Sequence, residues 1–275
     1  NPRGIWRQSP LDAYLAGKPV WTTLIDVDAL GKAEKQSWVW HGADCLAPEY
    51  KRCLVSLSPG GTDADIVREW DRTTKSFVDG GFALPLAKSS VTWENADNLL
   101  VATDYGEGSM TTSGYPRIVK RWTRGTPLSA ATKLVEGEKS DVGINVFGFT
   151  DGDKRWTGIS RNKSFYTNDY YLRSPADGGY RATIIPDTAD LRAVIDGQAI
   201  IFLNDAFGDF PAGSLLALPL DAMARGDHTA FVPVMTPTKA QAIENVAASK
   251  TILWVKALDD VEGKLFALRR DQPNG

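Results

Sequence analysis

Residues 38–78 read WVWHGADCLAPEYKRCLVSLSPGGTDADIVREWDRTTKSFV, and this stretch decides the fold. It contains four short β-type runs: SWVWHGA (37–43), RCLVSLS (52–58), DIVREWD (65–71) and KSFVDGG (75–81). Each run is rich in β-branched or aromatic residues and is bounded by strand-breaking residues such as Pro, Gly and Asp. The stretch therefore predicts a four-stranded antiparallel meander. Such a sheet cannot bury both of its apolar faces alone, so it needs similar sheets stacked against it.

Comparable units recur along the chain. Their first strands start near Trp38, Val91, Asn145, Leu191 and Ile243, at spacings of 53, 54, 46 and 52 residues. A period near 50 with four strands per repeat is typical of β-propeller blades, whereas a sandwich predicts no such long period. We therefore expect an all-β chain, a β-propeller of four-stranded antiparallel blades.

About five blade-equivalents are present, and we expect them to form a single propeller domain. The predicted blades lie at 4–30 (partial), 37–82, 90–138, 141–186, 191–236 and 241–270 (partial). The incomplete sheets at the two ends either complete one another and close a small ring, or remain the ends of an open arc. In the arc, exposed sheet faces favour self-association.

Charge and hydropathy exclude several classes of partner. The 275 residues carry a net charge of −3, which offers no electrostatic footprint for nucleic acid or an acidic membrane. No run approaches the roughly 18 apolar residues of a membrane span. We expect neither a nucleic-acid nor a membrane partner. Because the chain lacks an initiating Met, we expect a fragment. Since processing can remove an address signal, the sequence leaves open whether this soluble protein is cytoplasmic or periplasmic.

Cys45 and Cys53 are the only cysteines, eight residues apart on adjacent predicted strands. Two cysteines do not make a disulfide framework, and a Cys in a strand is commonly a buried free thiol. With His41 and His228 as the only histidines, no zinc-ligand set with plausible spacing occurs. We expect two free thiols, no metal and no cofactor.

Several runs carry a family resemblance. They are NPRGIWR (1–7), WVWHGADCL (38–46), GGFALPLAKSSVTW (80–93), SGYPRIVKRWTRGTPL (113–128) and PAGSLLA (211–217). Together they resemble the non-catalytic N-terminal propeller of bacterial prolyl oligopeptidases, serine peptidases that cut short peptides after proline. The resemblance implies seven blades followed by an α/β-hydrolase domain, with the propeller as a lid that restricts access to small peptides. The implied partners are short proline-containing peptides and that catalytic domain.

No catalytic residues are expected in this chain. A nucleophile elbow needs Gly-x-Ser-x-Gly at a strand-to-helix turn, and the nearest string, 158–162, ends in Asn162 within β-rich sequence. Neither His41 nor His228 has a nucleophile in motif context, so no triad can be assembled. The fragment is therefore expected to be catalytically inactive.

The resemblance points to one substrate-binding candidate, Lys88. In the family, a residue just before the Trp-bearing strand of the third blade contributes to the substrate's distal pocket, and residues 88–90 match that position. Here these residues are polar, whereas animal relatives have an apolar one. His41 is read either as facing an axial channel or, preferably, as a structural hydrogen-bonding residue packed against Trp38 and Trp40.

The basic run at Arg117, Lys120 and Arg121 either presents charge to the hydrolase domain or, preferably, forms a solvated outer strand. The glycine-rich insert at 106–116 predicts a mobile surface loop at the domain interface.

Two other function classes stay open. A propeller glycosidase would use paired carboxylates near strand ends, as at Asp104, Asp141, Asp196 and Asp205, although Asp also closes ordinary turns. A free-standing propeller interaction module would require a closed ring.

Overall fold

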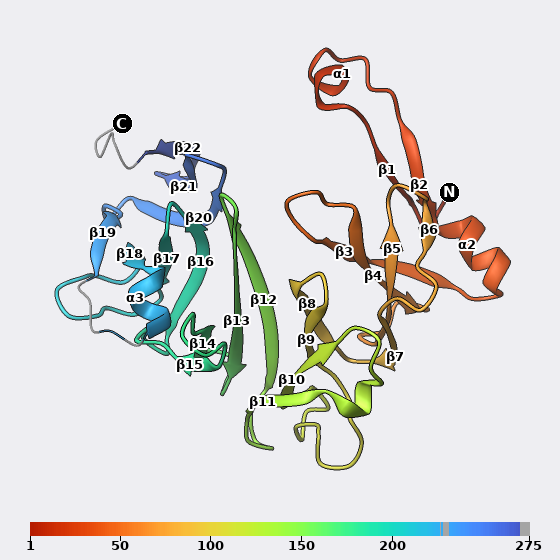
Figure 1. The fold of residues 1–275 in the computed structure, drawn as a ribbon. Helices are drawn as coiled ribbons and strands as arrows, with labels where there is room; N and C mark the ends of the chain where they lie inside the picture. The colour runs from red at the N-terminus through yellow and green to blue at the C-terminus, as the bar shows by residue number, and fades with distance from the viewer. Residues whose placement is uncertain (226, 228–230, 270–275) are drawn as a thin grey trace.

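The computed structural model describes residues 1–225, 227 and 231–269. Five antiparallel sheets and an N-terminal hairpin follow one another in sequence order along an arc (Figure 1). The expected all-β fold of antiparallel blades is confirmed. His228 lies outside the described residues, as does residue 270 at the end of the last predicted blade.

The N-terminal hairpin pairs β1 (Ile5–Gln8) with β2 (Thr22–Asp26), and a short helix, α1 (Leu11–Leu15), lies in the connection. Helix α2 (Val27–Glu34) follows, and its Ala, Leu, Glu and Lys residues are good helix formers. It begins where the Asp26 side chain accepts a hydrogen bond from the Ala29 N–H, an N-cap.

The first full sheet differs from the predicted meander in its fourth strand. It contains β3 (Trp38–Cys45), β4 (Arg52–Pro59), β5 (Asp65–Asp71), β6 (Ser76–Phe77) and β7 (Ala83–Ala87). The expected fourth strand, β6, has only two residues, and β7 pairs with the remaining edge of β5. Leu84 of β7 is buried, which gives this segment the apolar anchor that a blade edge needs.

The next two sheets each have four strands. The second contains β8 (Ser90–Asn95), β9 (Asn98–Ala102), β10 (Ile118–Thr123) and β11 (Thr132–Glu136), with a 3-10 turn at Leu128–Ala130. The third contains β12 (Gly143–Asp151), β13 (Lys154–Asn162), β14 (Asn168–Arg173) and β15 (Tyr180–Ala182).

The last two sheets complete the described chain. The fourth contains β16 (Ala189–Ile195), β17 (Gln198–Leu203), β18 (Leu215–Pro219) and β19 (Val232–Met235), with helix α3 (Leu220–Arg225) before β19. The fifth has three described strands, β20 (Gln241–Ala248), β21 (Leu253–Asp259) and β22 (Glu262–Leu268).

Strand β9 shows how the sheets stack. Leu99 and Val101 pack in one apolar cluster with residues of the first sheet, whereas Leu100 and Ala102 pack in another cluster with residues of the third sheet. All four side chains are fully buried. Because successive residues of a strand point to opposite faces, β9 is sandwiched between two neighbouring sheets. This face-to-face stacking is the arrangement of propeller blades.

The two ends of the arc are not joined within the described residues. Strands β1 and β2 pair only with each other, and β20, β21 and β22 form their own sheet. Figure 1 shows the hairpin and the last sheet standing apart at the two ends of the arc. Of the two arrangements considered from the sequence, the structure is the open arc.

Candidate functional site

Lys88 lies where the first two blades meet. It follows β7, and its Nζ is 3.3 Å from Asp63 Oδ2 in the β4–β5 loop. Nζ also lies 4.0 Å from the ring centre of Tyr115 in the β9–β10 loop, and the Tyr115 hydroxyl donates to Asp63 at 3.2 Å. Connections of this kind share one rim because strands alternate in direction in a meander. The rim therefore carries a cationic and aromatic cluster that can contact a polar ligand, and the role of Lys88 in substrate binding stays a prediction.

His41 sits at a bulge in β3, where the pairing register shifts between Trp40 and Gly42. Its Nδ1 lies 2.6 Å from Oδ1 of Asp65 on β5. Burial raises the pKa of Asp65, and the opposing charge and hydrogen bond of His41 only partly offset that effect. The preferred reading as a structural histidine fits this pairing, and its partner is a carboxylate.

The basic run is not a solvated strand edge. Arg121 of β10 donates to Glu94 of β8 through Nε at 2.6 Å and Nη2 at 2.7 Å. Arg173 of β14 and the hydroxyl of Tyr180 in β15 reach the same carboxylate, each at 3.1 Å. The Glu94 side chain is 5% exposed. The solvated reading was wrong for Arg121, because its face of β10 turns toward the third sheet and the guanidinium joins two blades.

The other two cations of this run are also engaged. Arg117 Nη1 donates to Glu136 Oε1 at 2.7 Å, and the Lys120 ammonium lies 4.1 Å from the ring centre of Tyr105.

The glycine-rich insert is a loop with internal hydrogen bonds and buried side chains. Ser109 and Thr111 are buried, and the Thr111 N–H donates to the Tyr115 carbonyl at 2.8 Å. A shallow cavity of about 450 Å³ opens beside it, lined by residues including Asp104, Glu107 and Lys139. The loop shape is therefore set by internal hydrogen bonds, which composition alone does not reveal.

The four candidate carboxylates lie in different connections. Asp104 accepts from the Gly106 N–H and the Ser109 hydroxyl, and Asp205 is an exposed loop residue. Asp196 occupies the β16–β17 turn with a positive φ of 49°. These arrangements are typical of turn residues.

Asp141 is the buried member of that set. Its carboxylate accepts from Arg161 Nε at 2.7 Å and from Arg161 Nη2 at 3.2 Å. Burial alone would raise the pKa of Asp141, but the Arg161 hydrogen bonds, the Glu138 backbone N–H and the Arg161 charge outweigh it, so the pKa is lowered. A carboxylate held this way is a poor proton donor.

Ser160 does not form a nucleophile elbow. It lies within β13, and its hydroxyl donates to Asn162 Oδ1 at 2.9 Å. Among the residues that the structure describes, no group of three or more His, Cys, Asp or Glu side chains is arranged to hold a metal. A search of the same residues for a helix with the length and apolarity to span a membrane finds none.

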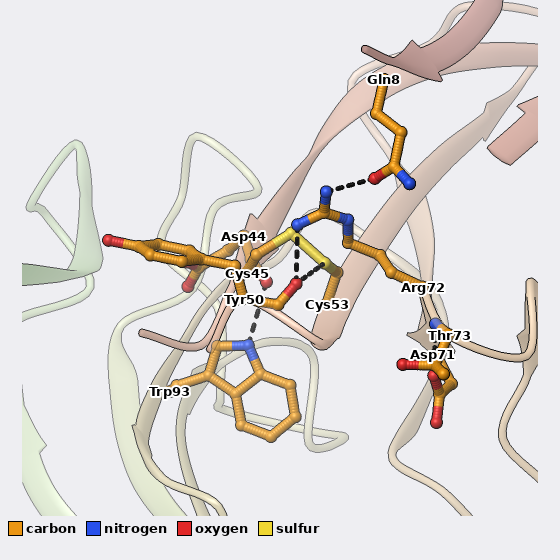
Figure 2. Close-up of a disulfide and its surroundings, with 9 residues drawn as sticks. All are labelled: Gln8, Asp44, Cys45, Tyr50, Cys53, Asp71, Arg72, Thr73 and Trp93. Carbon is orange, nitrogen blue, oxygen red and sulfur yellow. Dashed lines mark hydrogen bonds between the residues drawn. A yellow bond between two sulfur atoms is a disulfide. The ribbon is translucent and has the colours of Figure 1, made fainter. Parts of the chain in front are cut away.

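Cys45 and Cys53 form a disulfide, which corrects the expectation of two free thiols. They face each other at the ends of β3 and β4, with Cα atoms 3.9 Å apart. Their equal distance from Glu49, at the centre of the connection between the two strands, is the sequence signal that could have found the pair. Figure 2 shows the surroundings: Arg72 donates to the Tyr50 carbonyl and to Gln8, and the Trp93 indole donates to the Asp44 carbonyl. The disulfide therefore lies where the hairpin and the first two blades meet.

Comparisons with known proteins identify the relatives of this chain. No family model matches it. Uncharacterized peptidase y4nA of Sinorhizobium fredii is 33% identical over 274 residues, which cover 96% of this chain and 38% of that protein. The structure of a post-proline cleaving enzyme from Rickettsia typhi matches with a TM-score of 0.88 and 28% identity, over 99% of this chain and 42% of that chain. A prolyl endopeptidase at 12% identity and a TM-score of 0.72, matched over 92% of this chain and 36% of its own, shares the fold.

This chain spans about two fifths of the length of these relatives. The similarity extends over nearly every residue, includes the blade architecture, and confirms the resemblance seen in the sequence. By sequence and by fold, the chain is similar over nearly its whole length to one part of a peptidase and of a post-proline cleaving enzyme.

Proposed function

We propose that this chain is the substrate-gating propeller of a prolyl oligopeptidase-type serine endopeptidase that acts on short proline-containing peptides. In this proposal the sheets of residues 1–275 form one propeller domain, with the hairpin and the last sheet as partial blades, and an α/β-hydrolase domain of the parent protein is the partner. The observation that carries the proposal is similarity over 96% and 99% of the chain to a peptidase and to a post-proline cleaving enzyme.

The chain by itself is proposed to be catalytically inactive. In support, Ser160 lies in mid-strand against Asn162, and His41 is paired with Asp65. The purified chain is expected to release no product from a Gly-Pro reporter peptide. Turnover that persists through successive purification steps, and that a serine-peptidase inhibitor abolishes, would contradict this.

Gating is tested in a chimaera that joins this chain to the remaining part of the Rickettsia typhi enzyme. We expect the chimaera to cleave a short Gly-Pro peptide and to reject a folded protein that contains the same sequence. The catalytic part without the propeller, if it folds, serves as the control and should lose this size selectivity. Equal selectivity with and without the propeller would contradict the gating role.

Lys88 is proposed as a substrate-contacting residue on the rim of the first two blades. Its ammonium group is held beside Asp63 and Tyr115, from separate loops, so a peptide at this rim would meet a positioned cation. In the chimaera, Lys88→Ala should raise KM for the short peptide with kcat unchanged. Lys133→Ala is the matched control, because Lys133 pairs with Glu136 on an exposed surface. Unchanged KM in the Lys88 variant would remove it from the substrate site.

Self-association through the open ends of the arc is a further part of the proposal. Leu265 of β22 is 66% exposed, and Leu11 and Leu15 of the hairpin tip are 71% and 75% exposed. Apolar side chains left uncovered at both ends favour contact between copies. Light scattering over a range of concentrations should show a mass that rises with concentration, and a monomer at every concentration would contradict the proposal.

The carboxylates that a propeller glycosidase would need are engaged in turns or, for Asp141, with Arg161. The open arc likewise gives no support to a free-standing interaction module, which requires a closed ring.

A further inference from the structure

A second cavity lies between the N-terminal hairpin and the first full sheet. Its volume is about 430 Å³. It is lined by aromatic rings, two arginines and one half of the disulfide: Trp6, Trp40, Tyr50, Arg7, Arg72 and Cys45. Its lining residues are different from those of the Lys88 rim, which uses the β4–β5 and β9–β10 loops.

The cavity is positively charged. Arg72 is partly buried and donates only to neutral oxygens, the Tyr50 carbonyl at 2.8 Å and the Gln8 side chain. Its Nε is buried without a hydrogen-bond partner. Arg7 lies 3.9 Å from the ring centre of Trp21, and within the described residues neither arginine has a carboxylate within ion-pair distance. Two guanidinium groups without a carboxylate partner attract anions, so this wall favours an anionic ligand.

The disulfide presents its two sulfurs unequally. Cys53 is 0% exposed, whereas Cys45 is partly exposed and lines the cavity. A thiolate that enters the cavity therefore meets Cys45 and not the fully buried Cys53. Attack on Cys45 forms a mixed disulfide between Cys45 and the small thiol, and it releases Cys53 as a thiolate. A second small thiolate then attacks the sulfur of the bound small thiol. This step releases Cys45 as a thiolate and forms the disulfide of the two small thiols.

The leaving group is also placed beside a cation. Cys53 Sγ and Arg72 Nη1 approach the same atom, the Tyr50 carbonyl oxygen, at 4.0 Å and 2.8 Å (Figure 2). A nearby guanidinium stabilises a thiolate and so favours its departure.

We propose that this cavity is a thiol–disulfide exchange site for small acidic thiols of the glutathione class. The arginines bind the carboxylates of the thiol, the aromatic rings contact its backbone, and Cys45 is the sulfur that is attacked. Reduction then opens the 46–51 loop, whose Tyr50 carbonyl is linked through Arg72 to Gln8 of the hairpin.

The first test compares thiols of different charge on the oxidised full chain. Reduction by glutathione, uncharged 2-mercaptoethanol and cationic cysteamine is followed by alkylation and mass spectrometry. Rates are divided by those on a small neutral disulfide, which corrects for intrinsic nucleophilicity. We expect a preference for glutathione of about fivefold or more at low salt, declining as salt screens the arginines. No exchange, or equal corrected rates for the three thiols, would overturn the proposal.

Variants that remove one arginine charge test whether Arg72 causes the preference for glutathione. Arg72→Gln should reduce the glutathione preference about threefold to tenfold, since it removes one cation from the wall. Arg181→Gln is the matched control, because Arg181 pairs with Asp177 on an exposed surface of the third sheet. Equal preference in the two variants would overturn the assignment of Arg72.

Single-cysteine variants test the unequal accessibility of Cys45 and Cys53. This test does not depend on Arg72, or on whether Arg72→Gln disturbs folding. With oxidised glutathione, Cys53→Ser should form the mixed disulfide on Cys45 at least about tenfold faster than Cys45→Ser forms it on Cys53, because reactivity follows thiol exposure. In denaturant the two variants should react equally. Equal rates in the native state, or faster reaction at Cys53, would overturn the proposal.

Discussion

Glu94→Gln tests whether a buried ion-pair network joins the second and third blades. Glu94 accepts hydrogen bonds from Arg121, Arg173 and Tyr180, and its side chain is 5% exposed. Glutamine keeps the shape of the side chain and removes its charge. The substitution replaces one carboxylate oxygen, a hydrogen-bond acceptor, by an NH2 group. This group is a donor and would face the donors of Arg121, Arg173 and Tyr180. The substitution should therefore weaken the inter-blade contact and leave the strands of each blade intact.

The expected loss follows from the exposure of each partner. Removing one member of a fully buried pair costs about 3–5 kcal/mol, because the remaining charge is left uncompensated. Here Arg121 is 26% and Arg173 is 44% exposed, so water restores part of their solvation. We expect the free energy of unfolding to fall by about 2–4 kcal/mol. A loss of 3 kcal/mol lowers the melting temperature by roughly 6–12 °C for a chain of this size.

Denaturant unfolding followed by tryptophan fluorescence measures this loss, with Glu136→Gln as the matched control. Glu136 also pairs with two cations, Arg117 and Lys133, but its own side chain is 35% exposed, so its loss should stay below about 1 kcal/mol. The double variant Glu94→Gln, Arg121→Gln should lose less than the sum of the single losses. If Glu94→Gln costs no more than Glu136→Gln, the network does not hold the blades together and the reasoning fails.

Two further predictions concern the third blade. In Gly158→Ala, the added Cβ would lie 2.3 Å from Phe147 Cζ, so we expect the free energy of unfolding to fall by about 1–3 kcal/mol. The control is Gly263→Ala, where the added Cβ has no atom within 4 Å. This variant should change the free energy of unfolding by less than about 0.5 kcal/mol. Equal losses in calorimetry would show that Gly158 is not a packing requirement. Asp141 has a pKa below its ordinary value of 3.8, so its contribution is present above that value and is lost as pH falls through the folded-state pKa. The stability difference between the native chain and Asp141→Asn should therefore narrow in acid as the Arg161 pair is lost, and a gap that stays constant from neutral pH to below 3.8 would contradict this.

The strand pattern was largely readable because its signals are local. Short apolar runs, at 53–55 in β4 and 99–102 in β9, mark these strands, and turn residues separate them from their neighbours. Dependence on local signals also explains the error at the fourth strand of the first blade, which was predicted at 75–81. KSFV has the better strand composition, yet β7 takes most of the edge of β5, and edge pairing depends on which segment the fold brings there.

The Lys88 candidate came from the family resemblance. The sequence did not reveal that Asp63 and Tyr115 would hold its ammonium group, because these residues lie on three separate connections. The disulfide was missed because the register between β3 and β4 decides whether Cys45 and Cys53 meet, and a shift of one residue would turn one of them to the other face.

By itself, the sequence determined the all-β class, the period near 50 residues and the family resemblance, because each depends on neighbouring residues or on short runs. Only the tertiary structure decided the open arc, the Glu94 network between blades and the cationic cavity beside the disulfide. These features join side chains that are tens of residues apart in the chain. They come within bonding distance only after the sheets have stacked, so the physical determinant is packing between blades, which local sequence patterns do not encode.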